Sequence, residues 1–192
     1  MIAIINYNAG NIKSVENALL RLGYDCVLTN DFDTLIQAKK VIFPGVGEAK
    51  SAMKYLVDSG LDQVILNLKQ PVLGICLGLQ LMCSKSEEGN VKCLGIFKNN
   101  VKKFEETDLV PHMGWNDIHT LNGNLFHGIQ NNEDLYFVHS YYADLSENTT
   151  AICEYIVPFS ASLEKDNFYA TQFHPEKSAD IGEKILKNFL EL

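Results

Sequence analysis

A cysteine held between two glycines, in the stretch Gly74-Ile75-Cys76-Leu77-Gly78, is the feature that most limits how this chain can fold. The apolar run just before it predicts a buried strand, and residues 77–84 are typical of the first turns of a helix. A residue at such a corner adopts a strained backbone, and small neighbours let the corner close. The N–H groups at the helix start favour thiolate over thiol. Cys76 is therefore either a reactive nucleophile or a small buried core residue.

Length and charge exclude several classes of protein. With 192 residues and an ordinary share of apolar residues, the chain is expected to form one domain, residues 1–192. A net charge of −8 argues against a nucleic-acid partner, which would require a basic surface. No apolar run approaches the roughly 18 residues that would span a membrane, and the chain start lacks the features of a signal peptide. We therefore expect a cytoplasmic protein with no membrane partner.

The cysteines indicate reduced thiols rather than a metal site. The five cysteines form an odd set, and none of them shows the paired spacing of metal ligands. Free thiols are typical of a cytoplasmic protein. We expect no metal and no cofactor.

The first half of the chain alternates short apolar strands with amphipathic helices. Strands are expected at residues 2–6, 26–28, 41–43 and 71–73, and helices at 14–22, 31–38, 48–59 and 61–69. A glycine- and asparagine-rich turn is expected at residues 7–11. This alternation predicts βαβ units and a largely parallel central sheet flanked by helices. The third helix is expected to face the core with Ala49, Met53, Leu56 and Val57.

The second half of the chain is richer in strand patterns. Strands are expected at residues 94–97, 100–104, 116–120, 134–142, 151–155, 159–163 and 168–173, followed by an amphipathic helix at 178–192. Lys165-Asp166-Asn167 is typical of a hairpin turn between the last two strands. The fold class is therefore α/β, with additional antiparallel strands in the C-terminal half.

A cysteine nucleophile needs a base and a group that orients the base. In Gln172-Phe173-His174-Pro175-Glu176, the proline fixes the backbone between a histidine and a glutamate, and side chains two apart in extended chain share a face. Glu176 can then hold one imidazole nitrogen of His174 while the other faces the thiol. The alternative is a structural histidine at a strand end.

Acyl transfer also needs N–H donors for the oxyanion that develops on the substrate. The backbone N–H of Leu77 directly follows the nucleophile. A second donor is expected from Val46 and Gly47, because Pro44-Gly45-Val46-Gly47 follows the third strand at the edge where open α/β sheets bind ligands. Since glycines flank Val46, its peptide group is free to reorient. We expect partner and ligand binding to complete this oxyanion site.

With these features the chain resembles the triad-type (class I) glutamine amidotransferases. The resemblance lies in the strand-to-helix corner at Cys76, called the elbow below (Gly74–Gln80), and in the segment Gln172–Glu176. Pro44–Gly47, Pro111-His-Met-Gly-Trp-Asn116 and Tyr136-Phe-Val-His-Ser-Tyr141 narrow it to the glutaminase subunits of imidazole glycerol phosphate synthases. The similar stretches extend over nearly the whole chain. The resemblance implies a single-domain class I glutamine amidotransferase-like fold.

The resemblance also implies an activity and a partner. Cys76, His174 and Glu176 would form the triad that hydrolyses L-glutamine to L-glutamate and ammonia. A barrel-shaped cyclase subunit, bound as a heterodimer, would use the ammonia to make imidazole glycerol phosphate and aminoimidazole carboxamide ribotide in histidine biosynthesis. Residues that would hold glutamine are Gln80, Glu88, His139, Ser140 and Tyr141.

Three alternatives stay open at this stage. A paralogous subunit could supply ammonia to a different synthase, such as one in sugar or glycan amidation, because Asn6 and Asn8 depart from the usual pattern of these subunits. The first turn and the loop after Gly47 are expected partner surfaces, and drift there would change the partner. The chain could also be a stand-alone cysteine hydrolase or a non-catalytic scaffold, although all three triad residue types are present.

Overall fold

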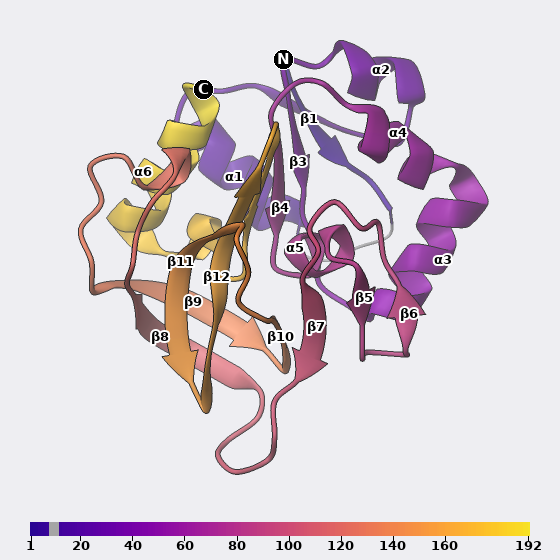
Figure 1. The fold of residues 1–192 in the computed structure, drawn as a ribbon. Helices are drawn as coiled ribbons and strands as arrows, with labels where there is room; N and C mark the ends of the chain where they lie inside the picture. The colour runs from indigo at the N-terminus through magenta and orange to yellow at the C-terminus, as the bar shows by residue number, and fades with distance from the viewer. Residues whose placement is uncertain (8–11) are drawn as a thin grey trace.

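The computed structural model describes residues 1–7 and 12–192, so most of the turn expected at residues 7–11 lies outside the described residues. A seven-stranded sheet with the order β11-β12-β13-β4-β3-β1-β2 forms the centre of the molecule (Figure 1). Its parallel part comprises β1 (Ile2–Ile5), β2 (Cys26–Thr29), β3 (Lys40–Phe43), β4 (Val72–Ile75) and β13 (Phe168–Thr171). The strands β11 (Thr149–Tyr155) and β12 (Val157–Lys165) extend one edge as antiparallel neighbours. The predicted α/β class with added antiparallel strands is confirmed.

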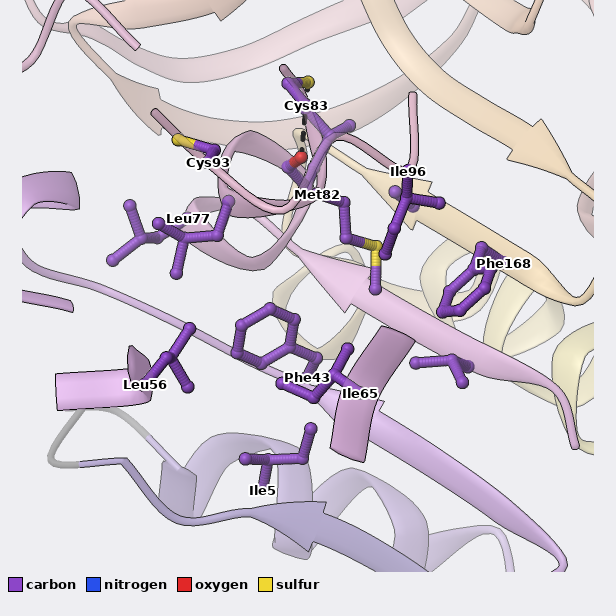
Figure 2. Close-up of a cluster of buried hydrophobic side chains, with 14 of the residues drawn as sticks. Ile5, Phe43, Leu56, Ile65, Leu77, Met82, Cys83, Cys93, Ile96 and Phe168 are labelled. Atoms are coloured by element: carbon purple, nitrogen blue, oxygen red, sulfur yellow. Dashed lines mark hydrogen bonds between the residues drawn. The ribbon is translucent and has the colours of Figure 1, made fainter. Parts of the chain in front are cut away.

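Helices cover both faces of this sheet because the strands are apolar on both faces. On one face lie α1 (Ile12–Arg21) and α6 (Ala179–Leu190), which pack with Ile2 and Ile4. On the other lie α2 (Phe32–Gln37), α3 (Ala49–Ser59), α4 (Leu61–Asn67) and α5 (Leu77–Met82), which pack with Ala3 and Ile5. Figure 2 shows Leu77 and Met82 of α5 above Phe43 of β3 in this second core. Among the described residues, no helix is both long and apolar enough to cross a membrane.

Smaller sheets and turns complete the second half. A four-stranded sheet has the order β10-β7-β5-β6 and comprises β5 (Lys85–Ser86), β6 (Val91–Lys92), β7 (Asn100–Lys103) and β10 (Tyr141–Ala143). The strands β8 (His112–Ile118) and β9 (Glu133–His139) pair antiparallel with each other. Short 3₁₀ turns lie at Asn124–Phe126 and Pro175–Lys177.

Three local predictions are wrong. Residues 94–97 do not form a strand, because the N–H groups of Leu94, Gly95 and Phe97 donate to the last carbonyl groups of the α5 region, at 2.8–3.0 Å. The strand expected at 116–120 begins earlier, at His112. Val57 is 58% exposed, since it lies at the flank of the α3 stripe whose centre is formed by Met53 and Leu56.

The elbow glycine Gly78 sets how closely α5 can approach the sheet. A methyl group added at this residue would lie 1.9 Å from the Phe43 carbonyl oxygen, which is a rigid backbone atom. We expect Gly78→Ala to lower the free energy of unfolding in urea by about 3 kcal/mol or more through overpacking. Gly23→Ala is the matched control. Gly23 has a φ of +82° and open space around it, so it should lose only the conformational cost of about 1–2 kcal/mol. Equal losses in the two variants would contradict the close approach.

Candidate active site

Cys76 occupies a strained corner between β4 and α5. Its backbone has φ 53° and ψ −106°, a conformation that L residues rarely adopt. Gly74 permits the corner, since a methyl group there would lie 3.0 Å from backbone atoms of Gly78 and Leu79. The Cys76 N–H donates to the Thr171 carbonyl at 2.7 Å, which ties the corner to the neighbouring strand β13. The structure therefore has the tight strand-to-helix corner that the glycine spacing predicts.

The predicted base, His174, and the carboxylate predicted to orient it, Glu176, follow β13, the parallel neighbour of β4. Nδ1 of His174 lies 2.8 Å from Oε1 of Glu176, and both side chains are buried. Because the carboxylate accepts, Nδ1 carries the proton and Nε2 is left to face the nucleophile. Nε2 has no hydrogen-bond partner among the residues that the structure describes.

The charge balance of His174 depends on Cys76. Burial alone would lower the pKa of His174, but its interactions with Cys76 and then with Glu176 outweigh burial and raise that pKa above the ordinary value of 6.5. This arrangement is suited to proton transfer between sulfur and imidazole.

The loop after β3 lies beside the elbow, as expected for parallel neighbours. Its conformation turns a carbonyl group toward the elbow. The Leu77 N–H donates to the Gly45 carbonyl at 3.3 Å, so the first expected oxyanion donor is occupied by the loop itself. Two anchors bracket this loop. The Tyr7 hydroxyl donates to the Pro44 carbonyl at 2.6 Å, and the Ala49 N–H donates to Oε2 of Glu88 at 2.7 Å. The Val46 peptide, which the sequence predicts to reorient, thus lies between two held ends.

One cavity of about 290 Å³ opens at the Cys76 side chain. It is lined by every residue that the sequence assigns to the oxyanion site or to substrate binding, namely Val46, Gly47, Leu77, Gln80, Glu88, His139, Ser140 and Tyr141. The predicted triad partners, His174 and Glu176, are buried and do not line it. The cavity volume suits a small polar metabolite.

The polar groups of the cavity are held by defined partners. Nε2 of Gln80 donates to the Tyr141 carbonyl and to Oε1 of Gln172, both at 3.0 Å. Burial raises the pKa of Glu88, and its bond from Ala49 only partly offsets that effect. Glu88 thus presents a half-buried carboxylate to the cavity. No cluster of three or more potential metal ligands occurs in residues 1–7 and 12–192.

Gln172 is a residue of the site that the sequence reasoning missed. Its Nε2 donates to Sγ of Cys76 at 3.6 Å, and its side chain is fully buried. On the other side, Sγ lies 3.9 Å from the Val138 carbonyl. The sequence did contain a signal for this role. Side chains two residues apart in an extended segment point to the same face, so Gln172 is on the same face as His174.

Comparisons with known proteins agree with this geometry. The family model described as "Glutamine amidotransferase class-I" matches residues 3–192. The imidazole glycerol phosphate synthase subunit HisH of Bacteroides fragilis (strain YCH46) is 61% identical, over 100% of this chain and 99% of the relative. The protein of the same name from Pasteurella multocida is 47% identical, over 99% of this chain and 97% of the relative.

Solved structures show the same fold at much lower identity. A protein described as a glutamine amidotransferase superposes with a TM-score of 0.77 at 18% identity, covering 100% of this chain and 98% of that one. PurLQS from Thermotoga maritima superposes with a TM-score of 0.72 at 16% identity, covering 99% of this chain and 97% of that one. With the family model spanning nearly every residue and full-length relatives well above 30% identity, the chain belongs to the class-I glutamine amidotransferase family.

Proposed function

We propose that this protein is the glutaminase subunit of an imidazole glycerol phosphate synthase and hydrolyses L-glutamine to L-glutamate and ammonia through a thioester on Cys76. The observation that carries the proposal is the strained Cys76 beside an imidazole that Glu176 orients at 2.8 Å, at the wall of a metabolite-sized cavity. The Bacteroides fragilis relative, named as a subunit of imidazole glycerol phosphate synthase, matches over nearly its full length at 61% identity.

The chemistry follows from the geometry. His174 takes the proton of Sγ, and the thiolate attacks the side-chain amide carbon of glutamine to form a tetrahedral oxyanion. The intermediate collapses to a thioester as His174 returns the proton to the leaving nitrogen, which departs as ammonia. His174 then activates a water that hydrolyses the thioester to glutamate. Glu176 keeps the imidazole in the Nδ1–H tautomer and stabilises its charged form.

The cavity wall supplies groups suited to the two ends of glutamine. The Glu88 carboxylate pairs with the α-ammonium group, and the Gln80 amide with the backbone of His139, Ser140 and Tyr141 forms the opposite wall. The Leu77 N–H and the Val46–Gly47 segment receive the oxyanion once the loop has reoriented.

We assign the ammonia to a cyclase partner in a heterodimer, because each relative cited above is named as a subunit of imidazole glycerol phosphate synthase. The partner would form imidazole glycerol phosphate and aminoimidazole carboxamide ribotide in histidine biosynthesis. The alternative, a paralogue for sugar or glycan amidation, is not favoured by these relatives. The five free cysteines suit a cytoplasmic enzyme.

A test of the function is the release of glutamate from glutamine, measured with and without the cyclase subunit and followed by the appearance of imidazole glycerol phosphate. The proposal expects stoichiometric transfer of ammonia into that product. Glutamate release without incorporation into it would favour a different synthase. Absence of glutamate release in both mixtures would refute the glutaminase.

An exposed apolar face beside the cavity suits the partner. Leu109, Met113 and Trp115 are 79%, 67% and 54% exposed, and they line a second cavity that shares Pro111 with the wall of the glutamine cavity. A partner that receives ammonia must cover the cavity mouth, and apolar aromatic side chains are typical interface anchors.

We expect Trp115→Ala to weaken the complex with the cyclase subunit about 10- to 100-fold, the usual effect of truncating a central aromatic anchor. Isothermal titration calorimetry would measure the change. Val57→Ala is the control, because Val57 is also an exposed apolar residue, 58% exposed, but lies on α3 away from β8 (Figure 1). An unchanged affinity for Trp115→Ala would place the interface elsewhere.

A further inference from the structure

Two buried histidines lie at the glutamine cavity, one of them in its wall, and the triad does not use them. His112 of β8 and His139 of β9 are directly opposite each other in the strand pair, and they are 4% and 6% exposed. Nδ1 of His112 lies 3.0 Å from Nε2 of His139. Aromatic rings surround the pair, namely Phe104, Phe137, Tyr155 and Phe159.

The hydrogen-bond partners determine which nitrogen carries each proton. Nδ1 of His139 lies 2.7 Å from the Tyr141 carbonyl, which can only accept, so this nitrogen is protonated. Its bare Nε2 then accepts from the Nδ1–H of His112. Nε2 of His112 accepts in turn from the side-chain amide of Asn116 at 3.2 Å. Every group has one consistent role when both rings are neutral.

Neutral rings are also what the surroundings favour. Burial lowers the pKa of His139 to about 3 and that of His112 to about 4. The groups that face the pair, namely the Tyr141 carbonyl, the Asn116 amide and the four aromatic rings, carry no formal charge at neutral pH. His174 also acts on His139, and it lowers the pKa of His139 further.

The same Tyr141 carbonyl connects the histidines to the nucleophile. It accepts a second hydrogen bond from Nε2 of Gln80, whose other proton goes to Oε1 of Gln172. Because Oε1 of Gln172 is thereby used as an acceptor, the amide nitrogen of Gln172 points at Sγ of Cys76. The directions of the Gln80 and Gln172 bonds therefore follow from the accept-only carbonyl, and the Nδ1–H of His139 helps to hold that carbonyl in place.

We propose that His112 and His139 are positioning residues that, as a neutral Nδ1–H pair, orient the Tyr141 carbonyl and through it the amides of Gln80 and Gln172, so that an N–H donor faces the sulfur of Cys76. This inference deepens the proposed glutaminase site and rests on it for its effect on turnover. The N–H donor stabilises the thiolate, since hydrogen bonds to charged groups are stronger than those between neutral ones. Loss of the donor makes the thiolate less available.

The first test needs no variant. Long-range ¹H–¹⁵N correlation spectra of the full-length protein at pH 7 report the tautomer of each imidazole. The proposal expects His112 and His139 to be neutral with the proton on Nδ1, although imidazole in water prefers the Nε2–H form. An Nε2–H tautomer or a charged ring at either residue would overturn it.

The second test uses two substitutions of His112. One removes the hydrogen-bond donor and keeps the aromatic stacking, and the other does the reverse. Phenylalanine keeps the stacking on Tyr155, where the ring centroids lie 4.1 Å apart, but removes the N–H donor to His139. Asparagine loses the stacking but places an amide N–H near the Nδ1 position. We expect H112F to lower both the rate of Cys76 alkylation by iodoacetamide and kcat for glutamine about tenfold, the effect of losing the Gln172 N–H donor to the charged sulfur. H112N should stay within about threefold of the wild type.

Each outcome decides between positioning and packing. A merely structural role predicts that the asparagine variant is as impaired as the phenylalanine variant, and that result would overturn the proposal, as would full reactivity of the phenylalanine variant. The buried thiols of Cys83 and Cys153 are internal controls in the same mass-spectrometric assay, and their slow labelling reports that the fold is intact. Alkylation and tautomer are measured without glutamine, so failure of the proposed glutaminase would appear separately, as absent turnover in the wild type.

Discussion

Cys76→Ala is expected to reduce glutamate release from glutamine by at least about 10⁴-fold, to the level of the uncatalysed background. The physical reason is that Sγ forms the thioester, and no other side chain of the cavity wall can replace a thiolate. The measurement is single-turnover and steady-state release of glutamate in the presence of the cyclase subunit. Cys83→Ala is the matched control, because that thiol is buried in the core, where it donates to the Leu79 carbonyl (Figure 2), and Cys83 does not line the cavity.

The triad partners should give a graded result. His174→Asn removes the proton acceptor and is expected to approach the effect of Cys76→Ala, whereas Glu176→Gln keeps the shape and loses the negative charge that selects the tautomer. Its expected loss in kcat is about 10²- to 10⁴-fold. Unchanged glutamate release in Cys76→Ala would refute the assignment of the nucleophile and with it the thioester mechanism.

The isolated subunit is expected to hydrolyse glutamine slowly and to accelerate about 10²- to 10³-fold when the cyclase subunit and its nucleotide substrate bind. In the structure the Gly45 carbonyl occupies the Leu77 N–H at 3.3 Å, so an oxyanion finds one donor already used. Freeing one oxyanion-hole donor is worth about 2.7–4 kcal/mol of barrier, which corresponds to this acceleration. Because Tyr7 holds Pro44 and Glu88 holds Ala49, the change is confined to the few residues between them.

The measurement pairs kinetics with a local structural probe. The amide ¹⁵N–¹H signal of Leu77 should shift when the complex forms, and kcat should rise while the Cys76 alkylation rate changes little. The Tyr169 amide is a suitable internal control, since it belongs to β13 within the buried sheet. Equal turnover with and without the partner would show that the Gly45–Leu77 bond does not limit the reaction.

Much of the fold could be predicted because its local signals agree with its tertiary environment. Strands buried on both faces read as short continuous apolar runs, and the helices between them carry one apolar stripe, so the first four strands of the parallel sheet were predictable from residues 2–75. The strand expected at residues 94–97 was wrong because a short apolar run that contains a glycine is ambiguous. Only the neighbouring end of α5 showed what the N–H groups of this run bind. The prediction that Val57 faces the core was wrong because Val57 lies at the edge of the apolar stripe of α3.

The candidate site divides in the same way. The elbow at Cys76 and the pair His174 and Glu176 are local patterns, in which backbone geometry over a few residues places the functional atoms. Gln172 and the pair of His112 with His139 acquire their roles from contacts between residues 27 to 96 positions apart in the chain. Spacing along the chain carries no information on the contact between His112 and His139.

By itself the sequence determined the chemistry available to this protein, because a cysteine between glycines and a histidine two residues before a glutamate impose their own local geometry. Only the tertiary structure decided which hydrogen bonds the catalytic groups make. It placed the Gly45 carbonyl on the Leu77 N–H, and it joined the buried histidines to the Cys76 sulfur through Tyr141, Gln80 and Gln172. The physical reason is that a hydrogen bond depends on where two groups meet in space, and only the packed sheet brings these segments to one edge.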